Sequence, residues 1–437
     1  MKVIALDAGG ATLKASIVTS NGPSTASILA NHVAYTSTNP SMMIMGQKLQ
    51  EYERQRVKLR YLRPVQRGYC VNWNVESELW IHLLSNEILN VKELTECSLV
   101  VTAPLLAPTI VNETMDQVVF EEIGLQAYAR VNAAESCVLS YSEHCEREYQ
   151  KNQIESMTFP AKTSFCTEQR NKTMGINSPT SAFLVDEDPL RFSTSSCHLV
   201  VDSGFSFTHV VPVIDGKVHA PGVRRINVGG KLLTNYLKEI VSFRQWNVMD
   251  DTQVINELKE TLCYCSMEFK NDLHRYHTDR QERKHWILPD FVHTFTGRCR
   301  EDGIVQDDEE QLAEANDEVL FNPSDIGIHQ AGIAKTIVQA VNACPEELSD
   351  AFYANILLVG GNTKFRNFRQ RLERDLRSLV PVDFDIGLHE PTDPVLAAWQ
   401  GCCSLARSDA LSERVVSKKE YEDMLLSVDN TLAMSPS

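Results

Sequence analysis

Two aspartates, Asp7 and Asp202, each end a short apolar run and are followed by a tight glycine turn. A buried strand that ends in glycine lets backbone N–H groups approach a phosphate, because no Cβ stands in the way. The carboxylate beside such a turn can hold a metal ion or a water molecule. A third apolar run, 356–359, ends in Gly360 and Gly361 without an aspartate. The three turns together predict a clamp for phosphate groups.

The elements around these turns must bring them to one cleft. Second apolar stretches follow at 11–18 and 205–214, so the first two turns are predicted to lie in hairpins that face each other. The third turn passes into a helical stretch over 363–379, which would place its glycine pair at a helix N-terminus. A single strand followed by Asp-x-Gly is common as an ordinary turn. The order hairpin, hairpin, strand–helix along the whole chain favours a nucleotide clamp instead.

The composition limits the class of protein. A chain of 437 residues with 43% hydrophobic and 23% charged residues is long enough for two globular domains. The formal net charge of -16 argues against a protein that grips nucleic acid on its own. The 12 cysteines include no CxxC pair, and we find neither a signal peptide nor an apolar run of about 18 residues. We therefore expect a soluble intracellular protein with reduced thiols.

Three segments carry further expectations. Apolar residues recur at helical spacing over 254–273, which predicts one long amphipathic helix. Cys263 and Cys265 would point apart on this helix, so we expect no metal site formed by them with the nearby His274 and His277. Residues 142–196 are polar and far longer than an ordinary loop of about 4–6 residues, and we interpret them as a mobile surface insertion. Residues 302–318 are strongly acidic and are expected to be exposed.

Several runs resemble the actin family. Residues 7–15 resemble the first phosphate loop of actin, and residues 202–212 resemble the second. Further matches follow in the family's order at 72–73, 259–264, 320–324 and 353–361. Longer runs resemble one nuclear subfamily of actin-related proteins, at 68–73, 206–209, 225–235, 248–250 and 321–327. The resemblance covers almost the whole chain, except 142–196, parts of 276–316 and the tail.

The resemblance implies an α/β fold of the actin-like ATPase-domain type, with two lobes around a nucleotide cleft. Each lobe would consist of two subdomains. The expected division gives 1–30, 69–141 and 394–437 to subdomain 1, 31–68 to subdomain 2, 197–228 and 317–393 to subdomain 3, and 229–316 to subdomain 4.

The resemblance also implies a set of nucleotide-binding residues, and each has a plainer interpretation. Lys14 could pair with a neighbouring carboxylate, and Asp202 could cap its own turn. His209 could be a buried core histidine, and Lys259 and Glu260 could be solvated on a helix. The convergence of three turns favours the nucleotide role for the set, which consists of Asp7, Gly9, Gly10, Lys14, Asp202, Gly204, His209, Lys259, Glu260, Gly360, Gly361 and Phe365.

Other positions depart from actin in ways that affect catalysis. Asn132 aligns with the glutamine that positions the attacking water and is one methylene shorter. Phe205 aligns with an acidic residue that holds the metal's hydration shell, and an aromatic ring cannot accept a hydrogen bond from metal-bound water. Gly10 and Ala11 replace a serine and a glycine of the first loop. We therefore predict no efficient ATP hydrolysis, no catalytic residue and no metal held by protein side chains.

The resemblance implies a non-catalytic structural subunit of a nuclear SRCAP/Swr-class chromatin-remodelling complex. Such a complex exchanges the 2A.Z variant histone into nucleosomes, and the actin-like subunit scaffolds accessory subunits on a separate motor. The expected partners are subunits of that complex and, indirectly, nucleosomal histones, but no membrane. The expected location is the nucleus, with the cytoplasm as a second location. ATP or ADP, with Mg²⁺ if bound, is allowed as a structural cofactor, because preserved adenosine contacts and a crowded phosphate site act in opposite directions.

Two alternatives belong to other functional classes. The first is an ATP-hydrolysing, filament-forming actin-like protein. Phe205 and Asn132 argue against its chemistry, and the divergent 31–68 region argues weakly against its filament contacts. The second is a kinase for a small metabolite, which would need a carboxylate base beside the γ-phosphate.

Overall fold

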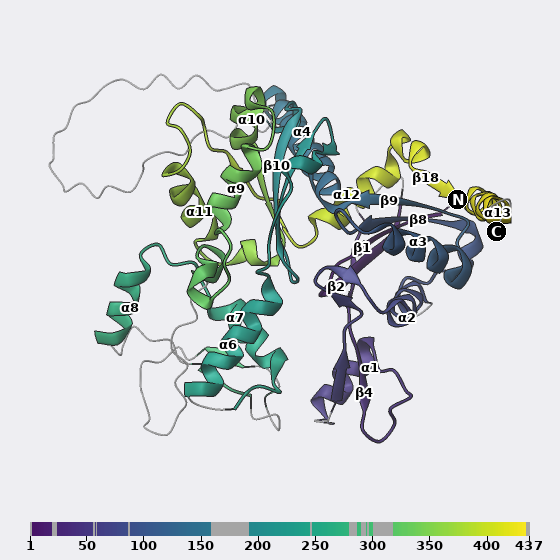
Figure 1. The fold of residues 1–437 in the computed structure, drawn as a ribbon, viewed down its shortest axis with the longest axis horizontal. Helices are drawn as coiled ribbons and strands as arrows, with labels where there is room; N and C mark the ends of the chain where they lie inside the picture. The colour runs from purple at the N-terminus through teal and green to yellow at the C-terminus, as the bar shows by residue number, and fades with distance from the viewer. Residues whose placement is uncertain are drawn as a thin grey trace.

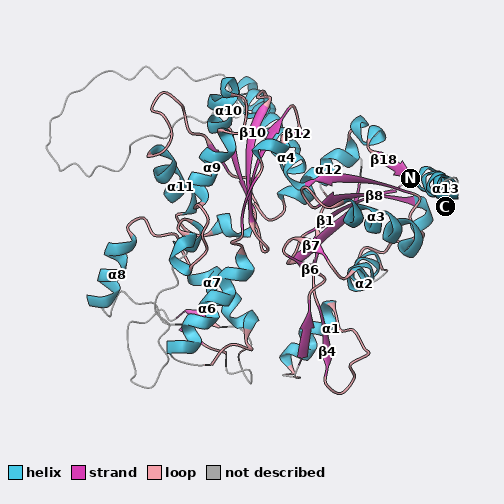
Figure 2. Cartoon of the chain, in the orientation of Figure 1, coloured by secondary structure: helices cyan, strands magenta, loops and turns pink. Residues whose placement is uncertain are grey.

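The computed structural model describes residues 2–19, 24–55, 57, 59–85, 88–158, 192–244, 247–278, 286–289, 294, 297–299 and 318–433. Two mixed sheets form the centres of two lobes, and helices cover the sheets and link them (Figures 1 and 2). The expected α/β architecture with two lobes is confirmed. No helix within the described ranges is both long and apolar enough to cross a membrane.

The first sheet has the strand order β18-β9-β8-β1-β2-β3. β1 and β2 form the first predicted hairpin, and β8 lies parallel to β1 on its other side. Ile4 and Leu6 pack on one face of this sheet and Ala5 on the other, as the period of two along a strand requires. The strands are β1 (Lys2–Ala8), β2 (Thr12–Val18), β3 (Ser27–Ala30), β8 (Cys97–Ala103), β9 (Ala127–Asn132) and β18 (Val415–Ser417).

The second sheet repeats this plan with the order β12-β11-β10-β16-β17, and β13 pairs with β11. β10 and β11 form the second predicted hairpin, and β16 lies parallel to β10. The turns after Asp7 and Asp202 therefore occupy equivalent ends of the two sheets. The strands are β10 (Cys197–Ser203), β11 (Thr208–Ile214), β12 (Lys217–Val218), β13 (Arg224–Ile226), β16 (Ile356–Val359) and β17 (Leu388–His389).

Two helices, α4 (Ala133–Thr158) and α12 (Ala397–Arg407), pack against each other where the lobes meet (Figure 1). α12 also packs on β1 and β8, whereas α4 packs on β10 and β11. Their close crossing depends on Gly401, since a Cβ there would overlap the carbonyl of Ser136. The hydroxyl of Ser136 in turn donates to the carbonyl of Ala398 at 2.8 Å. This helix pair joins the two sheets into one body.

The remaining elements cover the sheets or extend from them. Two small apolar clusters lie beyond the main cores, one around Ala34 and Ile44 and one around Ile255 and Trp286. In the first lobe lie β4 (Val33–Thr36), α1 (Gly46–Arg54), β5 (Leu59–Leu62), β6 (Val65–Gln66), β7 (Tyr69–Cys70), α2 (Trp73–Leu84), α3 (Thr109–Gln117), a π-helical turn (Val118–Ile123) and α13 (Lys418–Ala433). In the second lie α6 (Gly230–Arg244), α7 (Thr252–Leu262), α8 (Phe269–Thr278), β14 (Trp286–Ile287), β15 (Arg298–Cys299), α9 (Ile333–Val341), α10 (Ser349–Ala354) and α11 (Phe368–Arg377). Short 3-10 turns are Leu94–Glu96, Ala220–Gly222, Glu318–Leu320, Pro323–Ile326, Glu346–Leu348, Gly361–Lys364 and Asp409–Glu413.

The single helix predicted over 254–273 is wrong. The chain leaves the helical conformation at Cys263, where α7 ends, and α8 begins only at Phe269. Between them Tyr264 bridges to Arg366, and the N–H of Cys265 donates to the carbonyl of Arg366 at 2.9 Å. This long-range pairing outweighs the local helical spacing, and no glycine or proline marks the break.

The same pairing corrects the prediction for the third glycine turn. The helix expected over 363–379 begins at Phe368, and the glycine pair instead opens a 3-10 turn that ends at Lys364. Arg366, which pairs with Tyr264, lies in the extended stretch between the turn and the helix. The glycine pair is therefore not at the N-terminus of an α-helix.

The insertion predicted at 142–196 is shorter than expected. α4 continues through its first part and ends at Thr158. At the other end Phe192 is fully buried, and its ring lies edge-on to Tyr141 at a centroid distance of 4.7 Å. These apolar contacts attach both ends of the segment to the second lobe. Residues 159–191 of the predicted insertion lie outside the described residues.

The acidic segment 302–318, predicted to be exposed, is buried at its last residue. Glu318, its last residue, is only 8% exposed. The side chain is buried because Arg371 donates to both of its carboxylate oxygens at 2.8 Å. Residues 302–317 lie outside the described residues.

Candidate functional site

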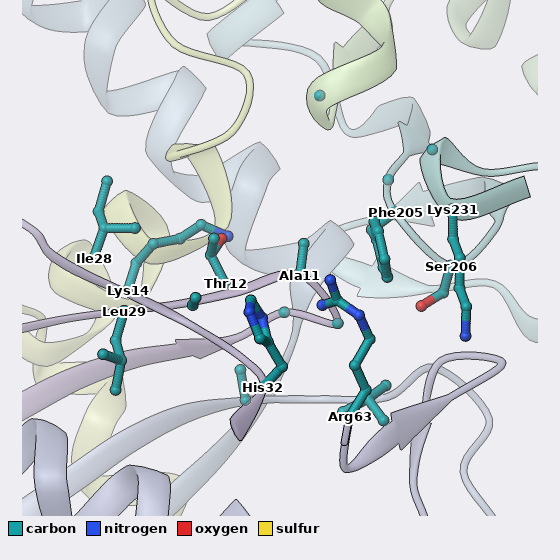
Figure 3. A pocket seen from close by; sticks show the side chains of 18 of the residues that line it. Ala11, Thr12, Lys14, Ile28, Leu29, His32, Arg63, Phe205, Ser206 and Lys231 are labelled. Carbon is teal, nitrogen blue, oxygen red and sulfur yellow. The ribbon is translucent and has the colours of Figure 1, made fainter. Parts of the chain in front are cut away.

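A cleft with a volume of about 3540 Å³ lies between the two lobes. Its lining comes from the first two hairpin turns, the end of β16, α7, and the segment around β5 and β6. Figure 3 shows the part of the lining around Lys14, Arg63 and Phe205. The structure brings every sequence-predicted residue to this cleft: Asp7, Gly9, Gly10, Lys14, Asp202, Gly204, His209, Lys259, Glu260, Gly360, Gly361 and Phe365. Their role in binding a nucleotide stays a prediction.

The first turn is organised by an ion pair. Lys14 and Asp7 are both buried, and Lys14 Nζ lies 2.8 Å from Asp7 Oδ2. This pairing is the plainer interpretation of Lys14, and it is confirmed. The hydroxyl of Thr102 donates to Asp7 Oδ1 at 2.9 Å and accepts from the N–H of Ala8 at 2.9 Å. Thr102 was not predicted from the sequence, because only the parallel pairing of β1 and β8 brings it beside Asp7.

A second set of hydrogen bonds supports this turn from behind. Asn31 Nδ2 donates to the carbonyl of Gly9 at 2.9 Å, and its backbone N–H donates to the carbonyl of Ala11 at 2.8 Å. Glu76 Oε1 accepts from Trp80 Nε1 at 2.9 Å and from Asn31 Nδ2 at 3.3 Å. Burial raises the pKa of Glu76 to about 7. The conformation of the first turn is thus coupled to a buried carboxyl group on α2.

The second and third turns are joined to each other. Asn362 Nδ2 donates to Ser203 Oγ at 3.1 Å and to the carbonyl of Gly204 at 2.9 Å. Gly360 has φ +92°, and a Cβ there would overlap the carbonyl of Ser203, so only glycine fits. Burial and the nearby charge of Asp7 raise the pKa of Asp202 to about 6. Asn362, which sequence reasoning missed, fixes the two turns as one unit.

The first and second turns lie directly against each other. A Cβ on Gly10 would lie 2.6 Å from Ser206 Oγ and 3.8 Å from Phe205 Cδ1. Val65, on β6, would be 3.5 Å from the same Cβ. The two turns therefore approach each other closely beside Phe205, and the crowding of a phosphate site by this ring stays a prediction.

The residues expected to have lost a catalytic role have other contacts. Asn132 Oδ1 accepts from the N–H of Ala134 at 2.9 Å, which caps the N-terminus of α4. His209 is 8% exposed, and its ring lies 4.0 Å from that of Phe207, centroid to centroid. Burial and the charge of Arg225 lower the pKa of His209 to about 4, so the ring is neutral at physiological pH. This environment favours the interpretation of His209 as a core histidine.

Lys259 and Glu260, both on α7, differ in burial. Lys259 is buried and donates to the carbonyl of Gly230 at 3.2 Å, to Thr234 Oγ1 at 3.1 Å and to Asn256 Oδ1 at 3.0 Å. Glu260 is exposed and accepts from Asn256 Nδ2 at 2.7 Å. The solvated interpretation therefore holds for Glu260 and is wrong for Lys259.

The two turns offer two carboxylates, Asp7 and Asp202, to a divalent cation. Asp7 is already paired with Lys14, and the acidic position beside Asp202 carries Phe205. Among the described residues, no three His, Cys, Asp or Glu side chains gather in a way that could hold a metal ion. The side chain of His277 is not among the described ones. The prediction that Cys263, Cys265, His274 and His277 form no metal site is therefore tested only in part.

Comparison with known proteins gives one consistent result. The protein-family model of actin matches residues 1–428. The chain is 31% identical over 432 residues to the protein named actin-related protein 6 of Drosophila melanogaster, covering 96% of this chain and 97% of that one. It is 33% identical over 392 residues to actin-related protein 6 of Arabidopsis thaliana, with 83% of each chain covered. A protein of the same name from Oryza sativa subsp. indica is 31% identical over 461 residues, 97% of this chain and 96% of the relative.

Proposed function

The chain belongs to the actin family, among the relatives named actin-related protein 6, and we propose that it is a non-catalytic structural subunit of a nuclear chromatin-remodelling complex. The complex would be of the SRCAP/Swr class, which exchanges the 2A.Z variant histone into nucleosomes. Its partners would be the accessory subunits and the motor, with histones contacted indirectly. The runs at 225–235 and 321–327 that resemble this nuclear subfamily support the proposal, together with the shared name of the relatives.

The contacts of Asn132 and Phe205 are the observation that supports the proposed lack of ATP hydrolysis. Asn132 lines the cleft, but its oxygen accepts the N–H of Ala134 and so is held at the N-terminus of α4. The ring of Phe205 lies beside the first turn and offers no acceptor to metal-bound water. Positioning of water and metal is most of the catalysis in phosphoryl transfer, so the loss of both supports binding without turnover.

We propose ATP or ADP as a structural cofactor in the cleft. The three glycine turns line the cleft, and Lys259 supplies a buried cation in the same cleft. A nucleotide would contribute stability in proportion to ln(1 + [L]/Kd), because it binds only the folded state. Bridging of the two lobes is then a sufficient role for it.

Affinity purification of the full chain from nuclear extract tests the subunit assignment. We expect a remodelling motor and the 2A.Z variant histone to be recovered with it in stoichiometric amounts. Sedimentation of the purified chain with ATP and Mg²⁺ should leave it in the supernatant. Recovery without a motor, together with a sedimenting polymer, would instead favour the filament-forming alternative.

A further inference from the structure

Arg63 occupies a distinctive place in the cleft. It lies between β5 and β6 of the first lobe, and its guanidinium carbon is 4.8 Å from the ring centroid of Phe205 in the second lobe. Figure 3 shows the guanidinium pointing into the cavity between His32 and Phe205. Phe205 also lies beside Gly10, so this cation lies close to where the first and second turns meet.

The charge of Arg63 has no anionic partner among the described residues. Its Nη1 is buried and donates no hydrogen bond there, and Nδ1 of His32 is also buried without a hydrogen-bond partner. Burial and the charge of Arg63 lower the pKa of His32 to about 4, so His32 is neutral and leaves the arginine as the local charge. Buried polar groups usually have hydrogen-bond partners, so this N–H group is suited to donate to a ligand oxygen.

Two of the other cations that line the cleft are buried and engaged, whereas Lys231, near Ser206 in Figure 3, is exposed. Lys14 is paired with Asp7, and Lys259 donates to three oxygens of the second lobe. Arg63 differs from Lys14 and Lys259, because its buried Nη1 has no partner in the described part of the chain and is left to donate to a new anion. A guanidinium suits this role, because its fork of N–H donors matches the oxygens of a phosphate.

We infer that Arg63 binds the phosphate groups of a nucleotide in this cleft and supplies positive charge that a divalent cation would otherwise supply. The inference rests on the proposed nucleotide binding and deepens it. It follows from two features seen together: an arginine beside the phosphate turns without an anionic partner in the described ranges, and an aromatic residue, Phe205, in place of an acidic one at the second turn. Nucleotide binding by this chain is then largely independent of Mg²⁺.

Calorimetric titration of the nucleotide-free full chain with ADP, in Mg²⁺ and in EDTA, tests this inference. For the unmodified chain we expect the two Kd values to agree within about threefold. Arg63→Leu should weaken ADP binding by at least about tenfold in EDTA, because a charge-assisted contact to phosphate is lost. Arg60→Leu is the matched control, since Arg60 is exposed on the neighbouring strand, and it should leave the Kd unchanged.

Two further ligands separate this inference from the proposed nucleotide site. Adenosine has no phosphate, so it should bind the unmodified chain and Arg63→Leu equally, which also shows that the variant is folded. Pyrophosphate should protect the unmodified chain from thermal unfolding but not the variant. ADP binding that EDTA abolishes, or that Arg63→Leu leaves unchanged, would overturn the role of Arg63 alone. If neither adenosine nor ADP binds any variant, both the role of Arg63 and the nucleotide site are wrong.

Discussion

Gly68 of the first lobe lies against the ring of Phe207 of the second, so closely that a Cβ on Gly68 would overlap the ring edge. Arg225 covers the same ring, with its guanidinium carbon 4.5 Å from the centroid, and donates to the carbonyl of Arg67 at 3.1 Å. The lobes thus contact each other directly at the cleft, away from the α4–α12 junction. This contact holds the two lobes together without any ligand.

Gly68→Ala should weaken this contact between the lobes. Gly68 has φ +82°, and we expect the substitution to lower the free energy of unfolding by about 2–3 kcal/mol through strain and overpacking. Gly216→Ala is the matched control, because Gly216 has φ +71° but nothing within 4 Å of its Cβ position. That control should lose only about 1 kcal/mol in urea denaturation. Equal losses for the two variants would show that the ring of Phe207 does not matter.

The pKa of Glu76 predicts a pH dependence of stability. Its folded-state pKa, about 7, lies above the usual value of 4.5, so the folded protein binds more protons than the unfolded chain between these values. Stability should therefore fall as pH rises from about 5 to about 7 and level off above. Glu76→Gln keeps an oxygen for Trp80 and should raise stability at about pH 8 by up to roughly 3 kcal/mol. Urea denaturation of the unmodified chain and of the variant across this pH range tests the prediction. Asp202 contributes to the pH dependence of both proteins. Parallel profiles of stability against pH would contradict the role of Glu76.

The capping role of Asn132 can be separated from any role in catalysis. Asn132→Ala should lower the free energy of unfolding by about 1 kcal/mol, because the N–H of Ala134 loses its acceptor. Asn132→Ser, which retains a capping oxygen, should stay within a few tenths of a kcal/mol of the unmodified chain. Thermal denaturation of the three proteins decides this. A large loss for serine as well would mean that the amide has some other essential contact.

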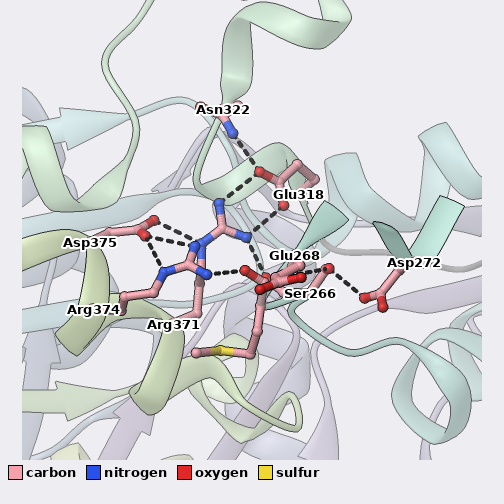
Figure 4. Close-up of polar contacts among 9 residues, drawn as sticks. Ser266, Glu268, Asp272, Glu318, Asn322, Arg371, Arg374 and Asp375 are labelled. Atoms are coloured by element: carbon pink, nitrogen blue, oxygen red, sulfur yellow. Dashed lines mark hydrogen bonds and ion pairs between the residues drawn. The ribbon is translucent and has the colours of Figure 1, made fainter. Parts of the chain in front are cut away.

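The Arg371 network should be the most sensitive polar cluster of the second lobe (Figure 4). Arg371 binds Glu318 through two nitrogens and Asp375 through Nε, each at 2.8 Å, and its side chain is 7% exposed. Arg371→Met would leave Glu318 buried without its partner, and we expect a loss of about 3–5 kcal/mol. Arg369 lies on the same helix, α11, and forms a half-exposed ion pair with Glu390. Arg369→Met should change the free energy of unfolding by less than about 1 kcal/mol. Similar effects of the two changes would contradict this account.

The parts of the structure that could be predicted from the sequence are those with local patterns. The glycine turns after Asp7 and Asp202 carry their signal in adjacent residues, and both hairpins formed as predicted. The helix over 254–273 failed because a bridge between Tyr264 and Arg366, far apart in the chain, replaced the local preference.

The site shows the same limit. Thr102 reaches Asp7 only through the pairing of β8 with β1, and Asn362 reaches Gly204 only through the pairing of β16 with β10. The available signal was a polar residue near the end of a strand: Thr102 precedes Ala103 and Pro104, and Asn362 follows the glycine pair. Arg63 gave no such signal, because its position over Phe205 depends on how the two lobes meet.

A single-turnover assay tests the central claim, that this actin-family chain binds nucleotide without hydrolysing it. The full chain is incubated in excess over γ-labelled ATP with Mg²⁺, and released phosphate is measured over several hours beside a buffer blank. The account predicts that phosphate release stays at the level of the blank. Phosphate release that exceeds the blank and disappears in Asp202→Asn would contradict it, because the cleft would then be catalytic despite Phe205 and Asn132.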